Sequence, residues 1–209
     1  MLEQKITIVG MGPGSRDYLL PIGLKKIMDA EVLIGGKRHL EEFNEVEAIK
    51  IEITNNLMDI KDYILQYKCS YRIAVLVSGD PGFHSIFTYL AKHIDKSNFE
   101  IIPGISSLQL AFSRISMTWQ DASLISLHGK ELNILNAFLA VSKLGVLTDK
   151  KNTPQAIAEY YYEKDILDKD MYLCENLSYQ NEKVTKYNVL QLAEEKREIN
   201  NCVVVICDN

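Results

Sequence analysis

The sequence lacks the motifs that mark several common kinds of active site. It has no Gly-x-Ser-x-Gly nucleophile elbow, no phosphate-binding Gly-x-x-x-x-Gly-Lys-Ser/Thr loop and no set of ligands with zinc spacing. These absences disfavour a reaction that needs a covalent protein nucleophile or a bound metal ion, so no metal site is expected.

Cysteine is scarce, and positive charge does not dominate. The four cysteines form no Cys-x-x-Cys pair, and three lie in or beside apolar runs, so buried reduced thiols are expected. The formal net charge of −5 argues against a nucleic-acid partner. No apolar run approaches the ~20 residues of a membrane span, and the first residues contain no signal-peptide core. We therefore expect a cytoplasmic protein with no membrane partner.

Apolar runs alternate with helix-like segments through the first half of the chain. Continuous β-branched runs predict buried strands at 6–9, 31–34, 49–53, 73–77 and 99–102. Helical spacing begins near Pro21, covers 55–68 and 83–94, and resumes after Ser106, where Gln109 gives a capping-box spacing. Strand, loop and helix in repetition predict an α/β fold with a mainly parallel sheet.

The second half of the chain has a different pattern. Strands are expected at 123–127, 144–147, 171–174, 183–185 and 202–206, and helices at 131–141 and 153–162. The last strands lie close together around a turn at 179–182, which favours a mixed sheet. We predict two α/β domains, at 1–116 and 122–209, joined by a polar linker at 117–121 that contains the only tryptophan, Trp119.

Glycine marks the ends of four predicted strands. The segments are Gly10-Met11-Gly12-Pro13-Gly14, Ser78-Gly79-Asp80-Pro81-Gly82, Pro103-Gly104-Ile105-Ser106-Ser107 and Leu127-His128-Gly129-Lys130. Open α/β sheets bind ligands at the carboxyl ends of their strands. Four such ends therefore predict one elongated, mostly uncharged cofactor cleft.

The first of these loops has three interpretations. Three positions without a Cβ atom let the backbone approach a ligand closely. A dinucleotide fingerprint would need glycine at position 15, where the chain has Ser15, and Pro13 removes an amide donor that a pyrophosphate would use. A purely structural tight turn is the third interpretation.

Two polar residues in the other loops also have alternative roles. Asp80 follows a buried strand, where a solitary carboxylate needs partners. It either accepts hydrogen bonds from backbone amides or contacts the cofactor or a substrate. Ser106 is expected to cap a helix, and such a cap can also offer backbone groups to a ligand.

Potential cations follow the second predicted strand. Lys37, Arg38 and His39 there mark either a solvated helix start or, because positive charge is unfavourable at a helix amino end, a site for ligand carboxylates. His84, His128 and Lys130 are further candidates, although a lone histidine is as readily structural.

The ordered motifs resemble those of the tetrapyrrole methylase family of S-adenosylmethionine enzymes, over essentially the whole chain. The marks are the Gly-x-Gly-Pro-Gly loop, the Gly-Asp-Pro loop at 79–81 and the Pro-Gly-Ile-Ser-Ser turn at 103–107. A branch that methylates C5 of a cobalt-containing corrin precursor shows further likeness, at 34–38, 78–83, 106–112, 126–129, 147–149, 152–154 and 174–177.

The resemblance implies two α/β domains with S-adenosylmethionine between them, and a homodimer. It places Pro13, Ser78, Gly79, Asp80 and Phe83 along the cofactor cleft, with Ser106 and Ser107 near the methionine part. It places Leu127, Thr148 and Leu177 on the adenosine side. Phe83-His84-Ser85 departs from the family's expected Phe-Tyr-Gly, which weakens a substrate role for His84.

The expected activity is methyl transfer to C5 of an anionic corrin precursor in cobalamin biosynthesis. Lys37, Arg38, His84, His128 and Lys130 are the expected substrate-binding residues, with no obligate acid or base. The resemblance also implies a separate protein for C15 methylation and decarboxylation, since the chain ends after its last predicted strand. The alternatives are a sister methylase with another acceptor, such as uroporphyrinogen III, and a non-catalytic dinucleotide-sensing module.

Overall fold

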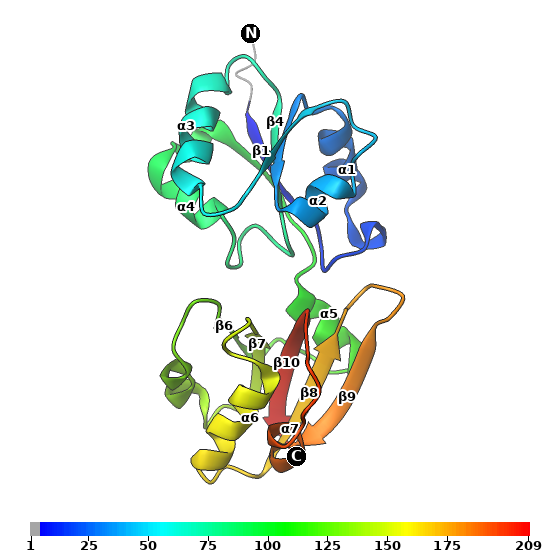
Figure 1. Ribbon diagram of the computed structural model, residues 1–209, viewed down its shortest axis with the longest axis vertical. Coiled ribbons are helices and arrows are strands. Elements are labelled where there is room, and N and C mark those ends of the chain that lie inside the picture. Colours follow the sequence, from blue (N-terminus) through cyan, green and yellow to red (C-terminus); the bar gives the residue numbers. More distant parts are fainter. Residues whose placement is uncertain (1–4) are drawn as a thin grey trace. The chain divides into compact units, whose positions relative to one another are not determined.

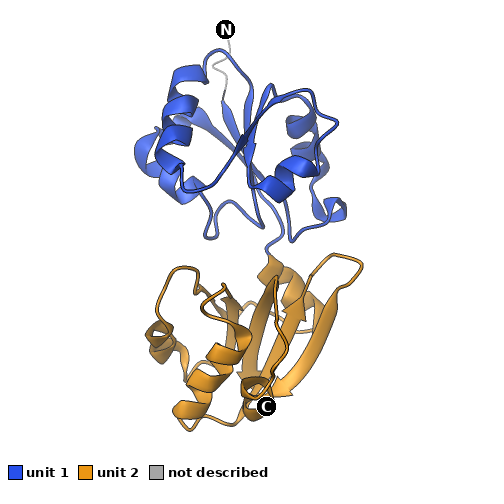
Figure 2. Cartoon of the chain, in the orientation of Figure 1, with its two compact units in different colours: residues 1–106 blue, residues 107–209 orange. Residues whose placement is uncertain are grey.

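The computed structural model describes residues 5–209 and contains two compact units, Met1–Ser106 and Ser107–Asn209 (Figure 2). Each unit has its own five-stranded sheet and its own hydrophobic core. The predicted two-domain α/β fold, with a parallel and a mixed sheet, is confirmed.

The sheet of the first unit is entirely parallel, with the order β3-β2-β4-β1-β5. Figure 1 labels β4 and β1, which are neighbours near the centre of this sheet. Its strands are β1 (Ile6–Gly10), β2 (Val32–Gly35), β3 (Ile49–Glu52), β4 (Ile73–Val77) and β5 (Phe99–Ile102). The three central strands are buried along their whole length, as their continuous apolar sequences predict for a sheet covered on both faces.

Helices cover both faces of this sheet. The helix α3 (Leu57–Tyr67) and the helix α4 (Phe87–His93) pack on one face through side chains such as Ile64 and Leu90. On the other face, α1 (Pro21–Met28) and α2 (Lys37–Glu41) contribute Ile27 and Leu40. Two short 3-10 helices, Arg16–Tyr18 and Lys96–Asn98, complete the unit.

The sheet of the second unit is mixed, with the order β6-β7-β10-β8-β9. Its strands are β6 (Ser123–Ser126), β7 (Lys143–Leu147), β8 (Lys169–Glu175), β9 (Lys183–Asn188) and β10 (Cys202–Asp208). Only the β6–β7 pair is parallel. The helices α6 (Pro154–Glu163) and α7 (Val189–Ala193) and the 3-10 helix Leu132–Phe138 cover one face.

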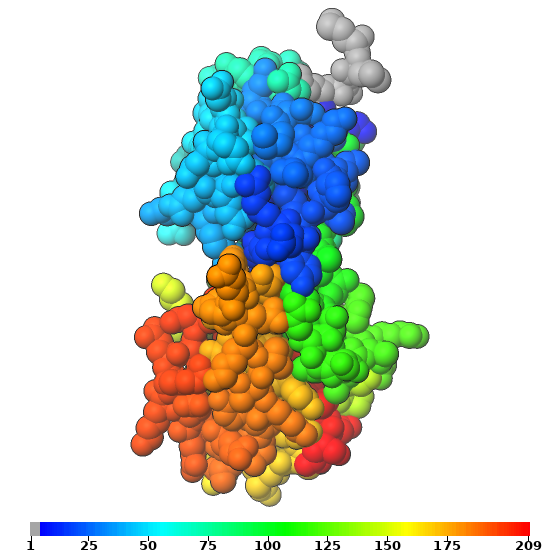
Figure 3. Space-filling model, turned by 90° about the vertical axis from the view of Figure 1, so that its right-hand side faces the viewer, coloured from blue at the N-terminus to red at the C-terminus, as the bar shows by residue number. Residues whose placement is uncertain are grey.

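The helix α5 (Ser107–Arg114) belongs to the second unit, ten residues before the predicted linker. It packs against β10 and β7, and a Cβ atom built on Gly145 of β7 would lie 3.2 Å from the Phe112 ring and 3.3 Å from Leu108. The space-filling view shows the green segment that starts with α5 beside the orange β8–β9 region (Figure 3). The division between the units therefore falls before α5, since its apolar side chains pack on the second sheet.

Two predicted helices differ from the structure, and one helix of the structure has no counterpart among the predictions. The helix α4 starts at Phe87 rather than at 83, because residues 80–86 form a turn in which the Phe83 amide donates to the Asp80 carbonyl. Segment 131–141 is a 3-10 helix over Leu132–Phe138, with no side-chain cap at Glu131. The helix α7 was not predicted, although a capping box between Asn188 and Gln191 marks its start.

The cysteines are all unpaired thiols, but they differ in burial. Cys174 and Cys207 are buried and Cys202 is half-buried, and burial raises the pKa of the Cys174 thiol to about 12. Cys69 is exposed because it lies in the turn after α3, which corrects the expectation of burial for that residue. Among residues 5–209, no helix is long and apolar enough to cross a membrane.

Candidate functional site

The carboxyl ends of the parallel strands meet at one edge of the first sheet. The register pairs Gly10 of β1 with Val77 of β4, and Gly35 of β2 with Leu76. The loops that follow β1, β4 and β5 carry Pro13, Ser78, Gly79, Asp80 and Ser106. The structure therefore brings the predicted cofactor residues of this unit to one edge, where a ligand of an open α/β sheet is expected.

Backbone packs directly against backbone at this edge. Gly12 and Gly79 form a two-hydrogen-bond bridge, with N···O distances of 3.3 and 2.8 Å. A Cβ atom on Gly104 would lie 2.2 Å from the Gly79 carbonyl oxygen, and one on Gly10 would lie 2.6 Å from the Gly104 nitrogen. The glycines therefore have a structural role, and they also leave backbone uncovered by side chains.

Asp80 ties two of these loops together. Its Oδ1 accepts a hydrogen bond from the Gly82 amide at 2.7 Å, and its Oδ2 accepts one from the Gly104 amide at 3.0 Å. The structural interpretation of Asp80 is thus present in the fold. A carboxylate offers about four lone-pair sites, so contact with a ligand remains compatible with this geometry and stays a prediction.

Pro13, Phe83 and His84 lie in the loops next to this bridge. Pro13 follows Gly12, and Phe83 closes the turn that begins at Asp80. The rings of Phe83 and His84 are 4.6 Å apart, edge to face, and His84 is exposed with a left-handed φ of 53°. The family's Phe-Tyr-Gly pattern would place a tyrosine at position 84. This chain has a histidine there, on a backbone in the left-handed region, which is strained for a residue with a side chain.

Ser78 contacts His39, which the sequence context predicts to be a potential cation. His39 lies in α2, is 6% exposed, and places its Nε2 3.3 Å from the exposed Ser78 hydroxyl. Burial, with a smaller effect of the Arg38 charge, lowers the pKa of His39 to about 4. His39 is therefore neutral near pH 7, which corrects its expected place among the cations.

Lys37 and Arg38 start α2, directly after Gly35 and Gly36, at the same edge of the sheet. Both side chains are exposed, and Lys37 makes a long 3.9 Å ion pair with Glu41. Positive charge in the first turn opposes the helix dipole. Their placement therefore agrees with a role toward an anionic ligand, which remains a prediction.

In the second unit, the predicted residues follow the parallel strands β6 and β7. Leu127 is buried and starts a turn in which the Lys130 amide donates to the Leu127 carbonyl at 2.9 Å. The buried Asn152 donates to the carbonyls of Leu127 and Lys130 at 2.8 and 3.0 Å. This places exposed His128 and half-buried Lys130 on a tightly held loop.

Asp149 holds the same turn from the loop after β7. Its carboxylate accepts hydrogen bonds from the amides of Gly129, Lys151 and Asn152 at 2.9, 2.9 and 2.6 Å. Burial alone would raise the pKa of Asp149, but these amides together lower it below its ordinary value. The spacing Asp149-x-Lys151-Asn152 is typical of a carboxylate that caps its own turn, a signal the sequence offered.

Thr148 and Leu177 lie at the same edge of the second sheet. The Thr148 hydroxyl donates to the carbonyl of Cys202, the first residue of β10, at 2.7 Å. Leu177 follows β8, is 4% exposed, and lies next to Asn176, whose amide donates to the Asn201 carbonyl at 2.9 Å. These hydrogen bonds hold the two loops in place, whereas the Leu177 side chain is buried with the hydrophobic core residues.

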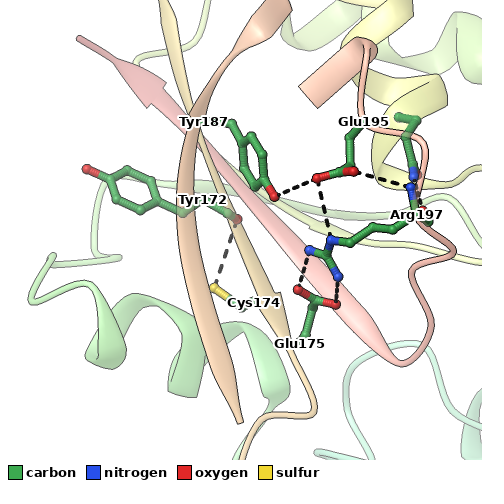
Figure 4. Close-up of polar contacts among 7 residues, drawn as sticks. Tyr172, Cys174, Glu175, Tyr187, Glu195 and Arg197 are labelled. Carbon is green, nitrogen blue, oxygen red and sulfur yellow. Dashed lines mark hydrogen bonds and ion pairs between the residues drawn. The ribbon is translucent and has the colours of Figure 1, made fainter. Parts of the chain in front are cut away.

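An ionic cluster supports the strand that leads to Leu177. Arg197 forms two 2.6 Å bonds to the buried Glu175 carboxylate at the end of β8, and Glu195 bridges Arg197 and Tyr187 (Figure 4). On the other side of Leu177, the Glu182 carboxylate accepts from the Ser178 amide and pairs with Arg114 of α5. Sequence reasoning assigned none of these residues, which are far apart in the chain.

The predicted site residues thus form two groups, one in each unit. Pro13, Ser78, Gly79, Asp80, Phe83 and the buried Ser106 belong to the first, and Ser107, Leu127, Thr148 and Leu177 to the second. Over residues 5–209, no three His, Cys, Asp or Glu side chains are grouped to hold a metal ion.

Comparison with known proteins gives the family. The model of the tetrapyrrole (corrin/porphyrin) methylases matches residues 5–193. The chain belongs to the tetrapyrrole methylase family. The match spans both units, so the family assignment covers both groups of predicted site residues.

Among related methylases, the chain is 36% identical over 195 residues to a probable cobalt-precorrin-7 C(5)-methyltransferase of Methanocaldococcus jannaschii, covering 90% of this chain and 91% of that protein. It is 31% identical to the cobalt-precorrin-7 C(5)-methyltransferase of Salmonella typhimurium, with 86% and 88% covered. The solved precorrin-6Y methylase of Archaeoglobus fulgidus aligns with a TM-score of 0.75 over 99% of each chain, at 22% identity. That structure supports the fold.

Proposed function

We propose that the protein transfers a methyl group from S-adenosylmethionine to C5 of cobalt-precorrin-7 in cobalamin biosynthesis. The observation that carries this proposal is the similarity to two cobalt-precorrin-7 C(5)-methyltransferases, which extends over most of each protein. The family match supports the reaction class, while the choice of C5 depends on these two relatives.

The first unit offers groups that fit the methyl donor. Its sheet edge leaves backbone accessible at the half-buried Gly79 and the exposed Gly82, where side chains are absent, and it presents the exposed Ser78 hydroxyl. When bound, S-adenosylmethionine supplies a methyl group that its sulfonium already activates. The protein then has to align donor and acceptor and exclude water, which needs no protein nucleophile.

Cations at the same edge suit the other substrate. Corrin precursors carry several carboxylates, and the exposed Lys37 and Arg38 are positioned to attract them. In the second unit, His128 and Lys130 lie on a turn fixed by Asn152, where they would add to this recognition. His84 is the weakest of the five, because its position departs from the family pattern.

Calorimetric titration with S-adenosylhomocysteine tests the first half of the proposal. Micromolar binding, roughly −8 kcal/mol, is expected. Incubation with S-adenosylmethionine and cobalt-precorrin-7, followed by mass spectrometry and NMR of the product, tests the second half. Methylation of a different precursor, such as uroporphyrinogen III, with none at C5, would replace the acceptor and keep the family. A folded protein without affinity for S-adenosylhomocysteine would refute both halves.

Three further properties belong to the proposal. The protein would act as a homodimer with S-adenosylmethionine as its cofactor. A separate enzyme would methylate C15 and remove the carboxylate. The proposed compartment is the cytoplasm, where thiols such as Cys69, Cys174, Cys202 and Cys207 stay reduced.

A further inference from the structure

We infer that His39 is a positioning residue that fixes the direction of the Ser78 hydroxyl, so that Ser78 donates its hydrogen bond outward to an acceptor atom of the bound methyl donor. The inference rests on the proposed function for the identity of the ligand. The direction of the hydrogen bond between His39 and Ser78, which is the geometric half of the inference, depends only on the contact between α2 and the end of β4.

The two side chains differ sharply in exposure. His39 is 6% exposed, whereas Ser78 is exposed at the carboxyl edge of the sheet, directly after the buried strand β4. The 3.3 Å separation of Ser78 Oγ and His39 Nε2 is at the long end for a hydrogen bond. The contact thus links a buried group to a group that a ligand can reach.

The other ring nitrogen decides which partner donates. His39 Nδ1 is buried and has no hydrogen-bond partner among residues 5–209. Near pH 7 the ring is neutral and carries one proton, because burial keeps its pKa near 4. A buried N–H without a partner is rarer and costlier than a buried acceptor without one. The proton therefore belongs on Nε2, and Nδ1 is a bare acceptor.

This tautomer sets the role of Ser78. With Nε2–H donating to Ser78 Oγ, the hydroxyl hydrogen cannot point at His39 and is available to the exposed side. The Ser78 hydroxyl then faces a ligand as a donor, which suits a carboxylate or a ribose oxygen of S-adenosylmethionine. A freely rotating serine would lose more conformational freedom on binding.

A double-mutant cycle tests the coupling between the two residues. We expect His39→Leu and Ser78→Ala each to weaken S-adenosylhomocysteine binding by about 3- to 10-fold. The double variant should bind no worse than Ser78→Ala. His39→Gln, which keeps an amide donor at the end of the side chain, should restore most of the affinity. Equal losses from His39→Leu in both backgrounds, or no loss in either, would overturn the inference.

Two controls separate this role from folding and from the proposed function. Leu40→Ala removes a buried side chain from the same helix without touching Ser78, and it should lower the melting temperature while leaving affinity unchanged. Imidazole nitrogen NMR of the unliganded wild type should show the proton on Nε2, and a proton on Nδ1 would overturn the assigned direction. No binding by the folded wild type would refute the proposed function and the ligand half of the inference, while the NMR result would still decide the geometric half.

Discussion

Replacing Gly104 by alanine tests whether the edge of the first sheet depends on direct backbone contact. The new Cβ atom would lie 2.2 Å from the Gly79 carbonyl oxygen and 2.9 Å from Gly10. The obstructing atoms belong to the backbones of the loop after β4 and of β1, so no side chain can rotate away. The loop after β5 would have to move by roughly 1 Å to restore an ordinary contact.

That movement has two costs. Overpacking of a rigid site costs about 1–3 kcal/mol. The shift would also break the 3.0 Å hydrogen bond from the Gly104 amide to the Asp80 carboxylate, and a bond to a charged group contributes about 1.5–3 kcal/mol. We therefore expect Gly104→Ala to lower the free energy of unfolding of the first unit by about 2.5–6 kcal/mol.

Thermal unfolding followed by circular dichroism measures the effect. For a unit of about this size, 1 kcal/mol shifts the melting temperature by roughly 4–8 °C, so a fall of at least ~10 °C is expected. The matched control is Gly36→Ala, because Gly36 has nothing within 4 Å and an ordinary φ of −63°. That variant should stay within about 1 kcal/mol of the wild type, because the lower freedom of the unfolded chain offsets the poorer fit of alanine at this N-cap position. If Gly104→Ala melts within the range of Gly36→Ala, the close packing does not exist.

Three more predictions use the polar groups. The folded pKa of His39, about 4, lies below the ordinary 6.5, so the unfolded chain binds a proton first as the pH falls. Stability should drop by about 3 kcal/mol between pH 7 and pH 4, and urea unfolding at several pH values should show a flatter profile for His39→Gln. Asp149→Ala should cost about 1–3 kcal/mol in urea unfolding, with faster hydrogen exchange at the Gly129 amide, whereas Asp149→Asn should cost less. Arg197→Ala should lower the free energy of unfolding by roughly 2–3 kcal/mol, because it leaves the buried Glu175 carboxylate unpaired. The double variant Arg197→Met with Glu175→Met should recover most of this loss. A double variant as unstable as Arg197→Ala would contradict the explanation.

The two exposed cations at the start of α2 give the prediction that concerns the substrate most directly. Lys37→Ala with Arg38→Ala should weaken tetrapyrrole binding more than S-adenosylhomocysteine binding, because the exposed cations face the sheet edge. The control, Lys25→Ala with Lys92→Ala, removes the same charge from the last turns of α1 and α4. Fluorescence titration with the tetrapyrrole measures both pairs. Equal affinities for the two double variants would show that net charge alone is responsible.

The strands were predictable because their signals are local. Runs such as Ile73–Val77 are continuous and rich in β-branched residues, and glycine follows their ends, so both their burial and the position of their carboxyl ends follow from the sequence. The unit to which α5 belongs was not predictable in this way. Its assignment depends on Leu108 and Phe112 packing over Gly145, a contact between segments more than thirty residues apart.

The environment of His39 was likewise not predictable from local sequence signals. Its sequence context, after Lys37 and Arg38, favours a cluster of three cations. Only the fold shows that the third side chain of this run points inward while the other two are exposed. The distance to Ser78 spans thirty-nine positions in the chain, so no local pattern carries it.

Folding and binding are expected to overlap at the glycine edge, which decides how variants there are to be interpreted. Asp80 joins the Gly82 and Gly104 amides, so loss of affinity in Asp80→Ala would follow from loop displacement even without any ligand contact. Lys37 is exposed and its ammonium pairs with Glu41 within the same helix, so we expect its removal, together with that of the exposed Arg38, to disturb the edge less than removal of Asp80 does. An affinity lost in Asp80→Ala is therefore informative only beside its melting temperature, whereas an affinity lost at the two cations reports on the ligand directly.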